Sequence, residues 1–173
     1  MTLHQLPAAD RTATPWRNGG GLTREVAAAT DGSWRVSLAE VAADGPFSVF
    51  PGLDRVLTVV TGPGLELTVG DAQPATVRPL HPFAFSGELP TTGRLLDGPV
   101  TALNLMARGR SLTVTVARGP VELRPAPGAT VLAVDLAGHD AVQVTHPDTA
   151  HAHDAVLLTI GPAGPGQEHA QPI

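Results

Sequence analysis

The chain of 173 residues contains no cysteine, no lysine and no tyrosine, and its aromatic residues are two tryptophans and four phenylalanines. The absence of cysteine excludes disulfides, thiolate nucleophiles and sulfur ligands for a metal. Every basic residue is an arginine, which together with the abundance of Ala, Gly, Pro and Val is typical of a GC-rich coding sequence. An arginine by itself is therefore weak evidence for a binding site in this chain.

Basic surfaces and long apolar runs are also lacking. The net charge is −5 at pH 7, whereas a protein that binds nucleic acid needs a basic face. No apolar run approaches the length of a membrane-spanning helix, and residues 1–5 lack the charged-then-apolar pattern of a signal peptide. The sequence therefore predicts a cytoplasmic protein whose partners include neither nucleic acid nor a membrane.

Short β-type segments recur along the chain between turns rich in Gly, Pro and Asp, and no segment shows convincing helical periodicity. Strands of this number and spacing predict an all-β fold, an antiparallel sandwich or barrel. The predicted strands are residues 22–29, 33–41, 46–50, 54–61, 64–69, 75–79, 82–86, 99–107, 111–117, 120–124, 129–136, 141–145 and 154–160.

The aromatic residues divide the chain into two unequal parts, because all six precede residue 86. We predict a first half, residues 1–108, and a second half, residues 109–173, which is built of Val, Leu, Ala and Thr and ends in a loose tail from about residue 161. Aromatic rings make rigid pocket walls as well as core. We therefore expect the pocket in the first half and a structural role for the second.

Residues 15–25, Pro-Trp-Arg-Asn-Gly-Gly-Gly-Leu-Thr-Arg-Glu, combine a bulky ring, three glycines and several polar side chains. Consecutive glycines indicate a positive φ or the close approach of another group to the backbone. The segment is either the rim of a ligand site or a tight turn flanked by an aromatic residue and a surface ion pair. We favour the rim, because functional residues concentrate on such loops.

Three further segments carry polar residues in an apolar context. In residues 33–40, Arg35 and Ser37 share one face of a predicted strand, where they are candidate ligand contacts. The same alternation is also typical of a half-buried outer strand without a ligand. In residues 44–55, two aromatics bracket Ser48, and an Asp-Arg pair precedes an apolar strand. These two charged residues are either ligand contacts or part of a solvated rim. Asn104 lies inside an apolar strand, where it either pins a loop or contacts a ligand.

Metal-binding and catalytic signatures are weak in this chain. His151 and His153 share one face of an extended segment and Asp154 follows, but no Glu stands at the spacing of a metal-binding cupin. Nucleophile-elbow, phosphate-loop and dinucleotide motifs are missing. Glu25 and Asp54 are the only carboxylates near the glycine motif, and spacing alone does not join them. We predict neither a metal nor another cofactor.

Five ordered segments, residues 15–25, 34–39, 45–55, 82–87 and 98–106, resemble the HutD/Ves family. The resemblance implies a double cupin, two fused β-barrels or sandwiches without the usual cupin metal ligands. It also implies an association with histidine utilisation, in which such proteins bind a small pathway intermediate and moderate flux or expression. Ala102 stands where the family usually has an acidic residue, and residues 106–109 lack one of the usual adjacent arginines, which leaves open a different ligand.

Two functions from different classes follow. The first is a non-catalytic protein that binds a small carboxylate and modulates histidine catabolism, and the alternative is a metal-free cupin enzyme, an isomerase or hydrolase acting on a small carboxylate. The anion candidates are urocanate, formiminoglutamate and formylglutamate, and a homodimer is compatible with the sequence. The predicted ligand contacts are Trp16, Asn18, Gly20, Thr23, Arg24, Glu25, Arg35, Ser37, Phe47, Ser48, Asp54, Arg55 and Asn104.

Overall fold

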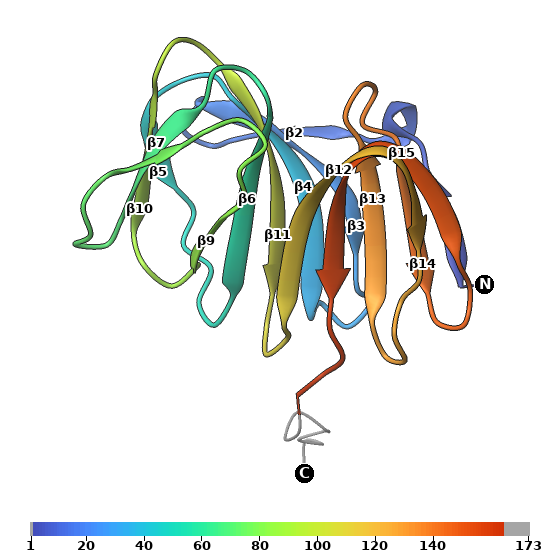
Figure 1. Ribbon diagram of the computed structural model, residues 1–173. Coiled ribbons are helices and arrows are strands. Elements are labelled where there is room, and N and C mark those ends of the chain that lie inside the picture. Colours follow the sequence, from blue (N-terminus) through green and yellow to red (C-terminus); the bar gives the residue numbers. More distant parts are fainter. Residues whose placement is uncertain (1, 165–173) are drawn as a thin grey trace.

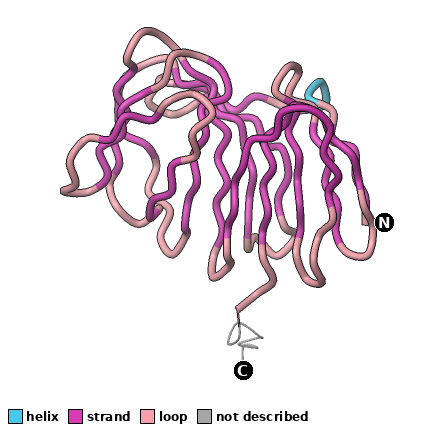
Figure 2. The backbone as a smooth tube through the Cα atoms, in the orientation of Figure 1, coloured by secondary structure: helices cyan, strands magenta, loops and turns pink. Residues whose placement is uncertain are grey.

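The computed structural model describes residues 2–164, and these residues form antiparallel strands joined by turns (Figures 1 and 2). In this part of the chain, the single helical segment is a 3-10 turn, Ala8–Asp10. The expectation of an all-β protein is confirmed. Alternation of β-branched and polar residues has therefore set the secondary structure, as the sequence indicated.

The strands form three sheets. The six-stranded sheet has the order β2 (Ala13–Pro15), β3 (Gly21–Ala28), β4 (Trp34–Val41), β11 (Val100–Ala107), β6 (Asp54–Thr61) and β9 (Phe83–Ser86). The five-stranded sheet has the order β1 (Leu3–Leu6), β14 (Ala141–Thr145), β13 (Thr130–Asp135), β15 (Ala150–Ile160) and β12 (Leu112–Leu123). The four-stranded sheet has the order β5 (Gly45–Phe47), β10 (Thr91–Leu95), β7 (Leu65–Val69) and β8 (Ala75–Val77).

The six-stranded sheet packs against both of the others. Val36 and Leu105 on one face join a core cluster with Leu158 of the five-stranded sheet. Leu57 on the other face joins a second cluster with Leu67 of the four-stranded sheet. Because successive side chains of a strand alternate between the two faces, each central strand supplies residues to both clusters. The central sheet is thereby fixed in position from both sides.

The two predicted halves both contribute strands to the five-stranded sheet. Strand β1, from the beginning of the chain, pairs with β14 and so joins the sheet that is otherwise built from residues 112–160. The division at residue 108 remains a prediction. Of the tail expected from about residue 161, only residues 161–164 belong to the described part, and there the N–H of Gly161 donates to the carbonyl of Ser111.

Three strands were not predicted, namely β1, β2 and β10. Strand β10 contains Gly93, a residue that ordinarily weakens a strand. Here glycine fits because a Cβ on it would lie 2.9 Å from the ring of Phe47. Residues 111–117 and 120–124, predicted as separate strands, form the single strand β12, whose register shifts between Ala117 and Pro120. Such tertiary contacts and irregularities leave little trace in the local sequence.

The glycine run has both of the properties that its sequence indicated. Gly19 has a φ of 73°, which favours glycine. A Cβ on Gly21 would lie 2.2 Å from the carbonyl oxygen of Glu40 and 3.2 Å from the Trp16 ring. The run therefore brings Trp16 and strand β3 against β4 without steric conflict.

Gly21→Ala should destabilise the protein by roughly 1–3 kcal/mol, because the new methyl group overlaps the Glu40 carbonyl of the neighbouring strand. The control is Gly32→Asn, at a position with a φ of 74° and open space around it. Asn adopts this conformation readily, so the control should change stability by no more than about 0.5 kcal/mol. Urea unfolding of both variants measures the difference, and equal stability of Gly21→Ala and wild type would contradict this packing.

Candidate functional site

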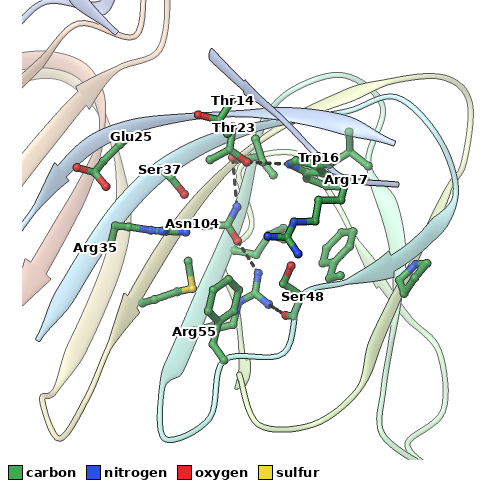
Figure 3. Close-up of a pocket in the computed structure, with 18 of the residues that line it drawn as sticks. Thr14, Trp16, Arg17, Thr23, Glu25, Arg35, Ser37, Ser48, Arg55 and Asn104 are labelled. Atoms are coloured by element: carbon green, nitrogen blue, oxygen red, sulfur yellow. Dashed lines mark hydrogen bonds between the residues drawn. The ribbon is translucent and has the colours of Figure 1, made fainter. Parts of the chain in front are cut away.

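A pocket of about 580 Å³ lies against the face of the central sheet that also carries the four-stranded sheet (Figure 3). Its floor comes from strands β3, β4, β6 and β11, and its walls come from the glycine motif and from the segment after β5. The lining residues are Thr14, Pro15, Trp16, Arg17, Asn18, Thr23, Glu25, Arg35, Ser37, Ala39, Val41, Pro46, Phe47, Ser48, Phe50, Arg55, Leu57, Ala102, Asn104 and Met106.

Strand alternation explains why polar residues reach this pocket. In β4, Arg35 and Ser37 line the pocket, whereas Trp34 and Val36 join the core on the opposite face, as predicted. In β11, Asn104 lines the pocket between Leu103 and Leu105 of that core. The face toward the five-stranded sheet is packed core, whereas the opposite face carries both the polar pocket residues and the apolar residues that pack against the four-stranded sheet.

Arg55 is the least solvated charged residue of the site. It is 5% exposed, and the faces of the Phe50 and Phe85 rings lie 5.1 and 4.8 Å from its guanidinium carbon. Its Nη1 donates to the Ser48 carbonyl and its Nη2 to Asn104 Oδ1, each at 3.3 Å. Asn104 therefore lines the cavity and accepts a hydrogen bond from Arg55, and its contact with a ligand remains a prediction.

The Arg55 guanidinium has no counter-charge within residues 2–164. No carboxylate of this part forms an ion pair with it, and its Nε is buried without a hydrogen-bond partner. Burial lowers the pKa of Arg55 to about 10, and the charge of Arg35 contributes to that lowering. Arg55 therefore stays charged at neutral pH, although its surroundings favour the neutral form.

Two other arginines direct positive charge at the same space. Arg17 and Arg35 approach Asn104 from opposite sides of the pocket (Figure 3). The Arg35 guanidinium carbon lies 5.7 Å from the centre of the Phe50 ring, which Arg55 also contacts. Guanidinium groups that converge without carboxylate partners repel each other, and an anion between them would relieve that repulsion.

The aromatic wall of the pocket is held rigidly. Trp16 Nε1 donates to Thr23 Oγ1 at 2.8 Å, which ties the glycine motif to strand β3. The Trp16 ring meets Phe47 edge to face, with 5.9 Å between the ring centres. This hydrogen bond satisfies the indole N–H, so the ring presents an apolar surface to the cavity.

Most of the predicted contacts lie on the pocket wall, but three do not. Arg24 alternates with Thr23 and Glu25, and its Nη1 pairs with Glu40 Oε1 at 2.8 Å. Arg24 was expected to hold the anion, but its side chain leaves β3 on the other face and does not line this pocket. Asp54 lines a separate hollow of about 380 Å³ together with Arg110.

Gly20, the third exception, is engaged within its own turn. Its N–H donates to Asn18 Oδ1 at 2.9 Å, and the N–H of Gly19 donates to the Trp16 carbonyl. These two glycine N–H groups are thus occupied, which corrects the expectation that the glycine run offers them to a ligand.

Sequence reasoning missed two prominent lining residues, Arg17 and Phe50. Arg17 stands inside the motif, between two predicted contacts, but a chain whose basic residues are all arginines gives a single arginine little weight. Phe50 is recognisable as an aromatic beside Ser48, but nothing local shows that its ring meets two guanidinium groups. The position of Arg17 in the motif is therefore an available signal, whereas the role of Phe50 is a tertiary property.

The histidine pair lies far along the chain from these lining residues, on β15. His151 and His153 are exposed, and His153 Nδ1 lies 3.4 Å from Asp154 Oδ2. Within the described residues, no group of three or more His, Cys, Asp or Glu side chains is arranged to hold a metal ion. Nor does the described part contain a helix long and apolar enough to span a membrane.

Arg55→Met tests whether the buried charge of Arg55 lowers the free energy of unfolding of the protein. A buried charge without a partner is costly, so an apolar side chain between Phe50 and Phe85 should leave the free energy of unfolding unchanged or raise it by up to about 2 kcal/mol. The control is Arg110→Met, since Arg110 joins Gly161 and Ser33 by hydrogen bonds. Loss of these bonds should cost about 1 kcal/mol. A larger loss for Arg55→Met than for Arg110→Met in chemical denaturation would show that Arg55 is structural.

The model of the HutD family matches residues 8–170. An uncharacterized 21.2 kDa protein in the hutC 3' region of Pseudomonas putida is 43% identical over 112 residues, 60% of this chain and 57% of that protein. Protein Ves of Escherichia fergusonii is 40% identical over 106 residues, 58% of this chain and 56% of that protein. The matched segment thus spans little more than half the length of these curated relatives.

Two solved structures are similar over nearly their whole length. HutD from Pseudomonas fluorescens SBW25 has a TM-score of 0.83 at 29% identity, covering 94% of this chain and 100% of that one. A conserved protein of unknown function from Pseudomonas aeruginosa PAO1 has a TM-score of 0.79 at 28% identity, covering 92% and 97%. The fold is the all-β double cupin that the resemblance implied. On the match of the family model to residues 8–170 and the similar fold of HutD from Pseudomonas fluorescens, the chain belongs to the HutD family.

Proposed function

We propose that this protein binds a small carboxylate in the pocket without transforming it, and thereby modulates histidine catabolism in the cytoplasm. The observation that carries the proposal is the buried Arg55 guanidinium, which has no carboxylate partner in residues 2–164. A carboxylate ligand supplies the missing charge and accepts two parallel hydrogen bonds from a guanidinium fork. Binding would convert a costly buried cation into a satisfied ion pair.

Contacts within the protein hold the binding groups of the pocket in place. Asn104 and Ser48 orient Arg55 by hydrogen bonds, and Phe50 supports both Arg55 and Arg35. Because these side chains are already ordered, little conformational entropy is lost when a ligand enters. The apolar surroundings also strengthen the attraction between guanidinium and carboxylate relative to water.

The rest of the pocket suits a small polar metabolite. Its volume of about 580 Å³ lies inside the usual range of about 300–1,000 Å³ for ligand pockets. Hydroxyl groups of Thr23, Ser37 and Ser48 line it beside the Trp16 wall. A ligand with at least one carboxylate and a planar or hydrogen-bonding remainder fits this lining. Urocanate has one carboxylate and a planar ring, whereas formiminoglutamate and formylglutamate have two carboxylates and a hydrogen-bonding group.

The comparisons support the link to histidine utilisation, because the family is HutD and one relative is described by its position next to hutC. The lining residues favour binding over the alternative, a metal-free isomerase or hydrolase. No histidine lies among the described lining residues, and Glu25 is the only carboxylate there. Glu25 lies opposite Ser37 in the β3–β4 pair, but no hydrogen bond joins their side chains in residues 2–164, and nucleophilic catalysis by this serine would require one.

Arg35→Gln should weaken binding of the cognate carboxylate about tenfold to a hundredfold, since a charge-assisted hydrogen bond is worth roughly 1.5–3 kcal/mol. Calorimetric titration with urocanate, formiminoglutamate and formylglutamate measures the loss. The matched control is Arg24→Gln, on the next strand but paired with Glu40 outside the pocket. This control should change affinity by no more than about twofold, as an exposed ion pair contributes little.

Two outcomes would contradict the proposal. If none of the three carboxylates binds wild type, the pocket does not serve this ligand class. If any of them is consumed during prolonged incubation with wild type and not with Arg35→Gln, the enzymatic alternative holds.

A further inference from the structure

Strand β12 is exceptional among the strands at the sheet edges. It has 12 residues, whereas the other edge strands, β1, β2, β5, β8 and β9, have four or fewer. Proteins keep edge strands short or block them, because a free edge presents unpaired N–H and C=O groups to other chains. The long edge of β12 is therefore a place where another strand can add.

The first half of β12, residues 112–117, has the composition of a pairing strand. Its sequence, Leu-Thr-Val-Thr-Val-Ala, carries no charge, and it pairs with β15 on one side only. Every second backbone N–H and C=O along its other side lacks a partner strand in residues 2–164. Pairing ends naturally after this segment, because Arg118 and Pro120 follow where the register shifts.

The side chains beside this edge leave apolar surface uncovered. Leu112, Val114 and Val116 pack against the core between the two sheets but are only half-buried. Leu112 also lines the hollow of about 380 Å³, which Phe85 of the neighbouring edge strand shares. A strand added to β12 would cover this rim of the sandwich and bury more of all three residues.

We propose that a second copy of this chain pairs its β12 antiparallel to this β12, so that the two five-stranded sheets become one continuous sheet. A two-fold axis through the strand pair satisfies both free edges at once, which gives a closed dimer rather than a fibre. The inner faces of both copies stay on the same side, because residues opposite each other in an antiparallel pair share a face.

Charge selects the register. Pairing centred on Val114 would set Arg110 opposite the partner's Arg118, two like charges. Pairing centred on Thr115 instead sets Thr115 opposite the partner's Thr115 and places the partner's Arg118 beside Leu112. It also sets Val114 opposite the partner's Val116 on the inner face, so that apolar side chains of the two copies cover one another. This contact occurs twice by symmetry, and it favours a second copy over an unrelated strand.

Light scattering after gel filtration tests the pairing through Thr115, whose side chain is exposed. Wild type at micromolar concentration should have twice the 17.8 kDa mass of the chain. Thr115→Glu and Thr115→Lys should each be monomeric, because each sets like charges across the two-fold axis. An equal mixture of the two variants should recover the dimer, since opposite charges then face each other. Thr76→Glu, an exposed residue of the three-residue β8, is the control and should remain dimeric.

The same measurement can overturn the inference in three ways. A wild-type protein that is monomeric throughout excludes the dimer. A Thr115→Glu dimer places the interface elsewhere, and a mixture that stays monomeric excludes the register centred on Thr115. Melting curves of each variant verify that it is folded. If wild type alone is monomeric but forms a complex with another protein that Thr115→Glu abolishes, the edge of β12 binds a strand of that protein and the dimer is excluded.

Discussion

Arg55 keeps a positive charge inside the protein with no carboxylate beside it in residues 2–164, and the pocket is arranged around that charge. Two aromatic rings cover the guanidinium, and two neutral oxygens accept its hydrogen bonds. Neutral acceptors orient a cation without neutralising it. The structure thus retains an unfavourable buried charge, which the carboxylate ligand that we propose would compensate.

The layered sheets make this arrangement possible. Since the central sheet is packed on both faces, its strands cannot shift to bring Arg55 into water or toward a distant carboxylate. The side chains that alternate toward the core contribute most of the apolar burial, which offsets the cost of the polar face. The face of β3, β4, β6 and β11 toward the five-stranded sheet is therefore packed core, and on the opposite face the pocket adjoins residues that pack against the four-stranded sheet.

The strand content and much of the pocket follow from the sequence for a simple reason. Period-two alternation determines which residues of a strand share a face, so the spacing of Arg35 and Ser37 alone is enough to group them. Alternation does not show which face of a strand meets a cavity, and Arg24 accordingly lies outside the pocket lining in which it was expected. Residues whose role depends on contacts distant in the chain, such as Phe50 and the Gly93 of β10, are equally out of reach of local patterns.

The most direct test of the account gives Arg55 an internal counter-charge. Asn104→Asp places a carboxylate where Asn104 Oδ1 now accepts a hydrogen bond from Arg55 at 3.3 Å. We predict that calorimetric affinity for the cognate carboxylate falls at least tenfold, about 1.4 kcal/mol, because the ligand must compete with the new ion pair. The unfolding temperature should stay the same or rise. An unchanged affinity in a folded Asn104→Asp protein would contradict the claim that an unpaired Arg55 is what the ligand satisfies.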